Sequence, residues 1–252
     1  MSSERQEHNE KNPWWGEHIH RYQEAIIYAK PNDTILDIAC GNGFGSFLLS
    51  QHTTKNVIGA DLSPETIAYC KQTFPSPSHL SFQQLDGTKT GIPDNYFDMV
   101  VSFETIEHTT QYKEMLREFY RITKKGGTVI ISTPNKAIQS PDGIVRNPFH
   151  TQEFTYFELY ELLREVFDDI AFYGQQYNRY AKKNTQNTIG KLVETMLYKR
   201  GIRKMPIAIQ DQIMKSIIGK PMYPMPSDYC LTMNKEEILK CKTFFIICKK
   251  NA

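Results

Sequence analysis

Residues 37–46 read DIACGNGFGS, and this stretch decides the expected fold. It follows the apolar, strand-like run TIL at 34–36 and leads into the helix-like run FLL at 47–49. Its three glycines allow the backbone to turn sharply at the end of a strand and to approach a ligand closely. The order of strand, glycine-rich turn and helix predicts a parallel sheet that holds a nucleoside at the carboxyl ends of its strands.

Acidic residues at the ends of the next strands support this prediction. The run NVIGA at 56–60 ends in Asp61, and a carboxylate at this distance from the turn can accept both hydroxyls of a ribose. Asp86 follows the run LSFQQL at 80–85, where it can accept a hydrogen bond from an adenine amine. Asp37, Asp61 and Asp86 thus close three successive strands, although any one of them alone is typical of a turn.

Length and composition indicate a globular protein. The chain has 252 residues, of which 40% are hydrophobic and 23% are charged. No run approaches the roughly 20 apolar residues of a membrane span, and the polar N-terminus lacks an apolar signal core, so we expect a cytoplasmic protein. The five cysteines include no Cys-x-x-Cys pair, which disfavours a disulfide framework and a structural zinc site.

Charge is unevenly distributed along the chain. Residues 175–225 contain ten Lys or Arg and two acids, a net charge of +8, whereas the whole chain carries +2. Such a segment indicates an anionic ligand or surface. The alternative is the solvated face of an inserted helical segment.

Strand-like runs alternate with helix-length segments over most of the chain, which predicts an α/β fold. We expect one domain over residues 1–252, built on a Rossmann-like, seven-stranded, mostly parallel sheet with helices on both faces. The expected strands are 34–39, 56–61, 80–85, 97–103, 127–133, 169–174 and 243–249, and the expected helices are 18–29, 44–52, 64–73, 110–123 and 154–166.

The expected helix ends carry recognisable signals. Ser63 can cap the helix at 64–73, Pro64 suits its first turn, and Glu65 complements its dipole. The helix at 110–123 is followed by KKGG at 124–127, a basic last turn and then glycine.

Two segments fall outside the alternating pattern. Residues 1–30 are expected to form a helical cap at the N-terminus. Residues 175–240 form a basic helical insertion before the last strand, and about 65 residues is an unusual length for a connection in a compact domain. We interpret this insertion as a lid over the ligand-binding edge or as an oligomer contact, which allows a homodimer.

The glycine turn discriminates between two cofactors. A dinucleotide fold requires Gly-x-Gly-x-x-Gly, and the third of these positions is Ser46 here. Asp37 would repel a pyrophosphate but can hold an ammonium group. A ligand with a ribose and a positively charged amino-acid tail therefore suits the turn better than NAD, and S-adenosylmethionine (SAM) is such a ligand.

The sequence resembles the class I SAM-dependent methyltransferases from about Tyr22 to about Phe172, and the final strand also agrees. The residues that carry the resemblance are the Asp-x-x-x-Gly-x-Gly turn, the acids after the second and third strands, FDMVVS at 97–102, EH at 107–108, RITKKGG at 121–127 and ISTPN at 131–135. The family often has glycine at the position of Ala39, a departure that we expect to matter little.

This resemblance implies a set of cofactor-binding residues. Arg21 is the expected partner of the SAM carboxylate. The full set is Arg21, Asp37, Ala39, Gly41, Gly43, Asp61, Leu62, Asp86, Gly87 and Ser102.

A second constellation follows the fourth strand. In a helical conformation Glu104, Glu107 and His108 would share one face, at positions i, i+3 and i+4. Methyl transfer to a hydroxyl requires loss of a proton, and His108 is the natural base because an imidazole titrates near neutral pH. A glutamate can orient its ring, so these three are the candidate catalytic residues. The alternative is that His108 is a polar cap on the next helix.

A third fragment, NPFHTQEF at 147–154, places His150 on the same rim of the sheet. Glu104, Glu107, His108 and His150 are plausible ligands for Mg²⁺ or another divalent metal. The set resembles that of methyltransferases acting on the terminal ribose of small RNAs, in which a metal helps a hydroxyl lose its proton. The whole pattern also resembles bacterial surface-glycan methyltransferases, so metal chemistry and acid–base chemistry both remain open.

The sequence therefore predicts a SAM-dependent O-methyltransferase. Its acceptor would be a hydroxyl of a sugar, a nucleotide-linked sugar or a similar polar small molecule, phosphorylated or nucleotide-linked because of the basic insertion, in surface-polysaccharide biosynthesis. A metal-dependent RNA ribose 2′-O-methyltransferase is one alternative, although the chain lacks a basic-aromatic platform for nucleic acid. A non-catalytic SAM-binding partner subunit is another, and Asp37 and Ser46 disfavour a nicotinamide oxidoreductase.

Overall fold

The computed structural model describes residues 14–74, 78–177 and 224–251, together with residues 209, 212 and 216. The chain divides into two compact units, and the larger one contains Arg21–Gln176 and residues 231–251. All the predicted site residues belong to this larger unit. Most of the predicted insertion at 175–240, including its basic stretch, lies outside the described residues. In the described part of the chain, no helix has the length and apolar character that a membrane crossing requires.

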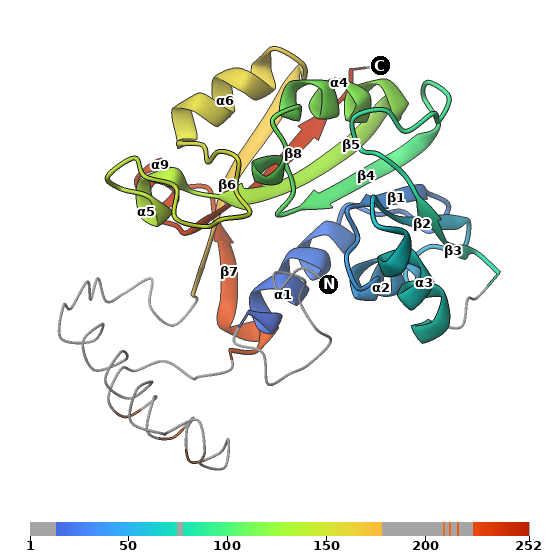
Figure 1. The fold of residues 1–252 in the computed structure, drawn as a ribbon, viewed down its shortest axis with the longest axis horizontal. Coiled ribbons are helices and arrows are strands. Elements are labelled where there is room, and N and C mark those ends of the chain that lie inside the picture. The colour runs from blue at the N-terminus through green and yellow to red at the C-terminus, as the bar shows by residue number, and fades with distance from the viewer. Residues whose placement is uncertain are drawn as a thin grey trace. The chain divides into compact units, whose positions relative to one another are not determined.

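Eight strands and a set of helices alternate along the chain (Figure 1). The strands are β1 (Thr34–Ile38), β2 (Asn56–Asp61), β3 (Leu80–Gln84), β4 (Phe97–Phe103), β5 (Thr123–Pro134), β6 (Asp169–Tyr177), β7 (Tyr229–Thr232) and β8 (Thr243–Lys249). The α-helices are α1 (Trp15–Ile26), α2 (Phe44–Ser50), α3 (Pro64–Thr73), α4 (Tyr112–Ile122), α5 (Lys136–Gln139), α6 (Tyr156–Arg164) and α9 (Lys235–Ile238). Two 3₁₀ turns are η1 (Ile106–His108) and η4 (Pro226–Asp228).

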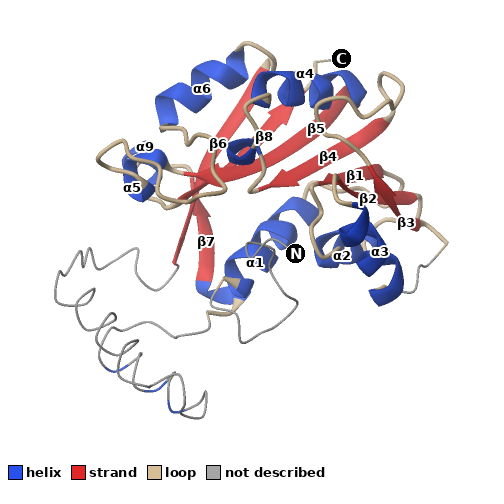
Figure 2. Cartoon of the chain, in the orientation of Figure 1, coloured by secondary structure: helices blue, strands red, loops and turns tan. Residues whose placement is uncertain are grey.

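The strands form one sheet in the order β3-β2-β1-β4-β5-β8-β6-β7. Neighbours from β3 to β5 are parallel, and β8 runs antiparallel between β5 and β6 (Figure 2). This arrangement confirms the predicted Rossmann-like α/β class. The sheet has eight strands rather than seven because the four residues YCLT at 229–232 form β7 inside the predicted insertion. β7 does not show the alternation that predicts a strand, because its two end residues are buried and its two middle residues are half-buried.

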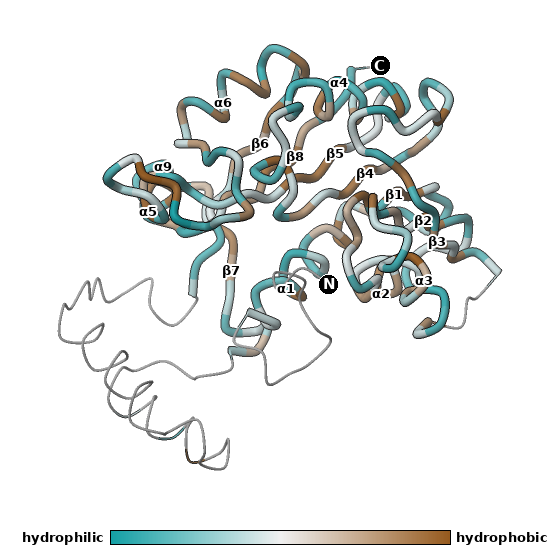
Figure 3. Tube along the Cα trace, viewed as in Figure 1, coloured by the Kyte–Doolittle hydropathy of each residue, from teal (hydrophilic) through white to brown (hydrophobic). Residues whose placement is uncertain are grey.

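Alternation along the central strands supplies two apolar layers. Leu36 and Ile38 of β1 pack with α4 and α6 on one face, whereas Ile35 packs with α2 and α3 on the other. Figure 1 shows α4 and α6 together on one side of the sheet, and Figure 3 shows the hydrophobic residues concentrated in the central strands. Burial on both faces explains why these strands are nearly continuous apolar runs in the sequence.

Helix ends agree with the sequence signals in α3 and depart from them in α4. The Ser63 side chain accepts a hydrogen bond from the Thr66 amide, which confirms the predicted cap. The glycine stop predicted for α4 is wrong. This helix ends at Ile122, and Thr123 is already extended because it pairs with Phe97 of β4.

Candidate functional site

The glycines in and after the turn between β1 and α2 serve two purposes. Gly41 has a φ of +55°, and among the described residues no heavy atom beyond its two chain neighbours lies within 4 Å of a Cβ placed on it. A Cβ on Gly43 would lie 2.8 Å from Cys70 Sγ, and one on Gly45 would lie 1.8 Å from the Tyr22 ring. Gly41 therefore offers close approach to a ligand, whereas Gly43 and Gly45 make room for packing.

Ala39 is strained at the start of this turn. Its φ is +62°, in the left-handed region that disfavours residues with a Cβ. The next amide, that of Cys40, donates to the Ala60 carbonyl of β2 at 2.8 Å and fixes this conformation. The presence of alanine instead of glycine at position 39 thus carries a conformational cost, contrary to the expectation that this departure matters little.

Asp37 is fully buried at the end of β1. Its carboxylate accepts hydrogen bonds from Ser46 Oγ at 2.6 Å and from the Tyr22 hydroxyl at 3.1 Å. Burial raises the pKa of Asp37 to about 7; the nearby charge of Asp61 also raises it, while the bonds from Ser46 and Tyr22 lower it. A buried carboxylate of this kind gains from a cationic partner such as an ammonium group.

The structure brings Asp37, Asp61 and Asp86 to the ends of three neighbouring strands, as predicted. Asp61 Oδ2 accepts from the Gly41 amide at 3.2 Å, and Oδ1 accepts from the Ser63 amide at 3.0 Å. Asp86 is exposed, and its Oδ1 accepts from the Thr88 amide and hydroxyl. Of the other predicted cofactor residues, Leu62 is exposed after β2, whereas Gly87 and Ser102 are buried after β3 and in β4.

Arg21 of α1 is fully buried beside this edge of the sheet. Its Nη1 donates to Glu104 Oε1 at 3.1 Å. Among the described residues, Nε and Nη2 of this guanidinium have no hydrogen-bond partner. A buried cation with unsatisfied donors matches a carboxylate ligand, so the residues present fit SAM at its amino-acid end.

The predicted helical face of Glu104, Glu107 and His108 is wrong. Glu104 has a φ of +50°, and only the short turn η1 follows, so the three residues do not share a helical face. Glu107 and His108 stay close together, whereas Glu104 accepts a hydrogen bond from Arg21. Besides Arg21, Glu104 contacts Ser132 of β5, whose hydroxyl donates to its Oε1 at 2.8 Å.

Glu107 is fully buried, and its Oε2 accepts from the Thr133 hydroxyl at 2.9 Å. Burial and the neighbouring charge of Glu104 raise the pKa of Glu107 well above its usual range. Its Oε1 lies 3.9 Å from His108 Nε2. The half-buried His108 bonds through Nδ1 to the Phe149 carbonyl at 3.0 Å, and because a carbonyl only accepts, Nδ1 carries the proton.

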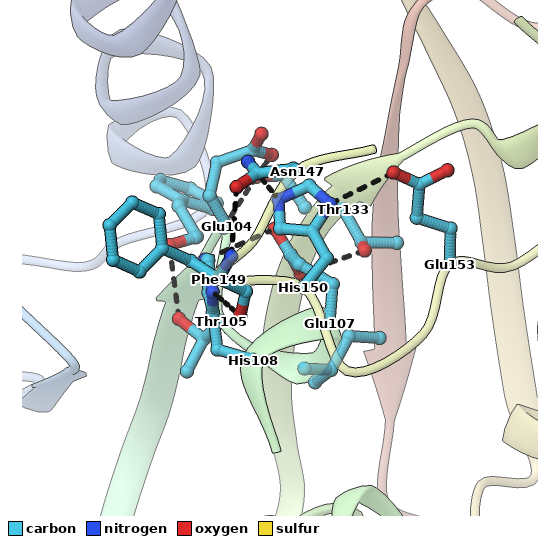
Figure 4. Close-up of polar contacts among 12 residues, drawn as sticks. Glu104, Thr105, Glu107, His108, Thr133, Asn147, Phe149, His150 and Glu153 are labelled. Atoms are coloured by element: carbon cyan, nitrogen blue, oxygen red, sulfur yellow. Dashed lines mark hydrogen bonds and ion pairs between the residues drawn. The ribbon is translucent and has the colours of Figure 1, made fainter. Parts of the chain in front are cut away.

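His150 lies beside His108, with 5.0 Å between the ring centroids. Its Nδ1 donates to the buried carboxylate of Glu153 at 2.9 Å, and its Nε2 accepts from the Asn147 amide at 2.9 Å (Figure 4). One nitrogen of each imidazole and one oxygen of Glu107 lie within 4.8 Å of one another, a group suited to a metal ion. The structure therefore brings three of the four predicted metal ligands together and draws Glu104 away to Arg21.

Two loops build this histidine cluster. Thr151 donates through its amide and its hydroxyl to the Glu107 carbonyl, at 2.8 and 3.1 Å. Gln152 Nε2 donates to the carbonyls of Ile106 and Thr109. The loop before α6 is thus fastened to η1, which fixes His150 against His108. Glu153 was not among the predicted site residues, and its one signal in the sequence is its spacing of three residues from His150.

Comparisons with known proteins agree with this geometry. The sequence profile of the methyltransferase domain family matches residues 36–131, from β1 to β5. A Mycolicibacterium smegmatis protein named "Probable S-adenosylmethionine-dependent methyltransferase" is 32% identical over 171 residues, which cover 66% of this chain and 65% of that protein. This chain therefore matches slightly less than two thirds of that relative's length.

More distant relatives give the same assignment. Phosphoethanolamine N-methyltransferase 3 of Arabidopsis thaliana is 33% identical over 117 residues, 46% of this chain and 24% of that protein. The crystal structure of a SAM-dependent methyltransferase from Archaeoglobus fulgidus superposes with a TM-score of 0.59 at 21% identity, over 93% of this chain and 94% of that one. The structural match shows the fold alone. The glycine turn, the strand-end acids, the methyltransferase-domain profile and the sequence relatives together show that the chain belongs to the class I SAM-dependent methyltransferase superfamily, whose cofactor is SAM.

Proposed function

We propose that this protein is an O-methyltransferase that transfers the methyl group of SAM to a hydroxyl of a sugar, a nucleotide-linked sugar or a similar polar small molecule. The cofactor supplies a methyl group on a sulfonium, an already activated carbon, so the protein's main tasks are positioning and removal of the acceptor proton. The observation that carries the proposal is the hydrogen bond that orients His108. Its Nδ1 donates to the Phe149 carbonyl at 3.0 Å, so Nε2 is the ring nitrogen that can act as the base.

The donor side follows from the strand ends. We assign the ribose to Asp61, the adenine amine to Asp86, the cofactor amine to Asp37 and its carboxylate to Arg21. The close approach of the backbone falls to Gly41, which has open space above its Cα. The remaining predicted residues, namely Ala39, Gly43, Leu62, Gly87 and Ser102, would complete the wall of this site.

The acceptor class rests on two sequence features. The resemblance to surface-glycan methyltransferases supports a sugar hydroxyl, and hence a role in polysaccharide biosynthesis. The +8 segment at 175–225 supports a phosphorylated or nucleotide-linked acceptor. Nucleotide-linked sugars are held in the cytoplasm, so the proposed acceptor implies a cytoplasmic location. The insertion at 175–240 is the segment through which the protein would form a homodimer.

The test is turnover of labelled SAM on a panel of nucleotide sugars, with the variants His108→Ala and His108→Gln. We expect both variants to bind SAM like the wild type and to lose about 10²- to 10⁴-fold in turnover, the usual contribution of a general base. Glu114→Gln, in an exposed position of α4, is the matched control. Full turnover by His108→Ala between pH 6 and 9 would contradict the assignment.

An amine acceptor is a second candidate, favoured by the similarity to a plant phosphoethanolamine N-methyltransferase. Phosphoethanolamine therefore belongs in the acceptor panel. Methylation of this amine, with no turnover on any hydroxyl, would replace the O-methyltransferase proposal. If no acceptor on the panel is methylated while SAM binds, the non-catalytic partner subunit becomes the better interpretation.

A metal-dependent mechanism, as in an RNA ribose 2′-O-methyltransferase, is favoured by the Glu107, His108 and His150 group. Two imidazoles and one carboxylate suit a first-row transition ion such as Mn²⁺ better than Mg²⁺, which prefers oxygen ligands. Loss of turnover with a chelator, and recovery with Mn²⁺, would establish the metal. Methylation of an oligoribonucleotide has to be measured separately, because metal use does not identify the acceptor.

A further inference from the structure

Glu104 is held in an unusual conformation by the residues around it. Its φ of +50° places a residue with a side chain in the left-handed region, and its amide donates to the Ser132 carbonyl at 3.0 Å. The Ser132 hydroxyl donates to Oε1 of the same residue at 2.8 Å, and Arg21 Nη1 donates to that oxygen at 3.1 Å. Glu104 therefore links β5 to α1 through one carboxylate oxygen.

The bond from Glu104 also fixes which edge of Arg21 remains for a ligand. A guanidinium is planar, and its Nε and Nη2 point along one shared edge. These two nitrogens are the ones that lack a partner among the described residues, and the whole side chain is buried. A carboxylate matches this edge with two parallel hydrogen bonds. The arrangement is complementary to one planar anion.

The neighbouring contacts place this edge at the cofactor turn. Tyr22, the next residue in α1, donates to Asp37, and its ring packs on Gly45. The anion that comes with the cofactor is the carboxylate of its amino-acid tail. In contrast, Glu104 is not a member of the Glu107, His108 and His150 group in which acceptor chemistry is expected.

We infer that Glu104 is a positioning residue, which holds Arg21 so that the Nε–Nη2 edge meets the SAM carboxylate, and that it takes no proton from the acceptor. This inference rests on the proposed donor site and is independent of the acceptor. It also moves Glu104 out of the catalytic set predicted from the sequence. Its Oε1 already accepts hydrogen bonds from both Ser132 and Arg21, so this oxygen is engaged in holding Arg21.

The experiment compares two ligands that differ only in the carboxylate, SAM and decarboxylated SAM, by titration calorimetry. We expect the wild type to bind SAM at least about tenfold more tightly, because a bidentate charged pair is among the strongest polar contacts. Arg21→Gln should reduce this preference to near one. Glu104→Ala should reduce it several-fold, and Glu104→Gln should fall between Glu104→Ala and the wild type, because a carboxamide oxygen still accepts from Arg21 and Ser132.

Glu114→Gln is again the control and should keep the full preference. Ser132→Ala removes the second donor to Glu104 and keeps the test decisive if Glu104→Ala does not fold. With an acceptor from the panel, Glu104→Gln should raise the KM for SAM by a larger factor than it lowers the turnover at saturating SAM, since a positioning role acts on binding and Gln cannot replace a proton acceptor.

Two results would overturn the inference. The first is an unchanged ligand preference in Glu104→Gln and Glu104→Ala together with an equal, large loss of turnover in both, which would make Glu104 catalytic. The second is a wild type that does not distinguish the two ligands, which would assign the Arg21 edge to an acceptor anion. In either case, turnover of the wild type on its acceptor would leave the proposed function intact.

Discussion

The hydroxyl of Tyr22 in α1 donates a hydrogen bond of 3.1 Å to the carboxylate of Asp37 at the end of β1. This bond joins a helix that precedes the sheet to the first acid of the cofactor turn. The ring of the same tyrosine packs edge-on against Phe103 of β4, with 4.9 Å between the ring centroids. α1 is thus tied to the donor site through both the polar and the apolar part of one side chain.

Tyr22→Phe should lower both stability and cofactor affinity while leaving the ring packing in place. Removing one partner of a buried hydrogen bond costs about 1–3 kcal/mol, and the loss of this donor raises the pKa of Asp37 further. Urea unfolding and titration with S-adenosylhomocysteine measure the two effects. An unchanged affinity at pH 6.5 would show that Asp37 does not contact the cofactor amine.

The raised pKa of Asp37 predicts a pH-dependent affinity for SAM. An ammonium group binds the ionised carboxylate, and with a pKa of about 7 only about a tenth of Asp37 is ionised at pH 6. The affinity for SAM should therefore rise by up to about eightfold between pH 6 and 7.5, as the ionised fraction of Asp37 rises from about a tenth to about three quarters. Asp37→Asn should bind weakly and with a flat pH profile over this range. A wild-type profile that is equally flat would contradict the prediction.

Asp37 should also affect unfolding, with a definite sign. Its pKa is higher in the folded state than the ordinary value of 3.8, so between about pH 4 and 7 the folded protein binds more protons than the unfolded chain. The contribution of Asp37 to the free energy of unfolding is thus full below about pH 4 and is lost as the pH rises through 7. Denaturation across this range should show a steeper fall in the wild type than in Asp37→Asn, because buried Glu107, whose pKa is also raised, contributes a fall to both.

Gly45→Ala should displace α1 from the cofactor turn. The added methyl group would lie 1.8 Å from the Tyr22 ring, a distance that no packing tolerates. We expect a loss of stability of about 1–3 kcal/mol, typical of overpacking. The double variant Gly45→Ala with Tyr22→Ala should recover part of that loss relative to the sum of the single variants. Strict additivity in denaturant unfolding would show that the two residues do not compete for space.

Ala39→Gly should stabilise the protein. Relief of the left-handed strain is worth about 1–2 kcal/mol, from which the greater backbone freedom of glycine in the unfolded chain removes about 0.5–1 kcal/mol. The expected net gain is about 0.5–1 kcal/mol in the free energy of unfolding, measured by denaturant titration. Ala60→Gly, at a buried position in β2, serves as the contrast and should destabilise. A loss of stability in Ala39→Gly would mean that its methyl group packs well enough to outweigh the strain.

The sheet from β1 to β5 could be predicted because its strands are buried on both faces and therefore read as apolar runs. The cap at Ser63 could also be predicted, since capping depends on local sequence. The turn after β4 could not be predicted, because the left-handed conformation of Glu104 is held by Ser132 from another strand. β7 was missed for a related reason, since a short edge strand is defined by the neighbour it pairs with.

In the candidate site, too, some positions could be predicted and others could not. The shared position of Asp37, Asp61 and Asp86 could be predicted because each follows a recognisable strand and parallel strands end at one edge. The hydrogen bond from Arg21 to Glu104 joins residues 83 positions apart, and no local sequence pattern predicts it. The structure places His150 close to Glu107 and His108, and their role as metal ligands stays a prediction. The separation of Glu104 from this group depends on a backbone angle that a motif does not encode.

The fastening of the loop before α6 to η1 has an evolutionary consequence. Thr151 and Gln152 donate hydrogen bonds to main-chain carbonyls of η1, so this attachment does not depend on which side chains η1 carries. Residues elsewhere in the loop can then change while the loop keeps its position. If the acceptor binds beside the histidines as proposed, substitutions around Phe149 would change the acceptor without disturbing the strands proposed to hold the methyl donor.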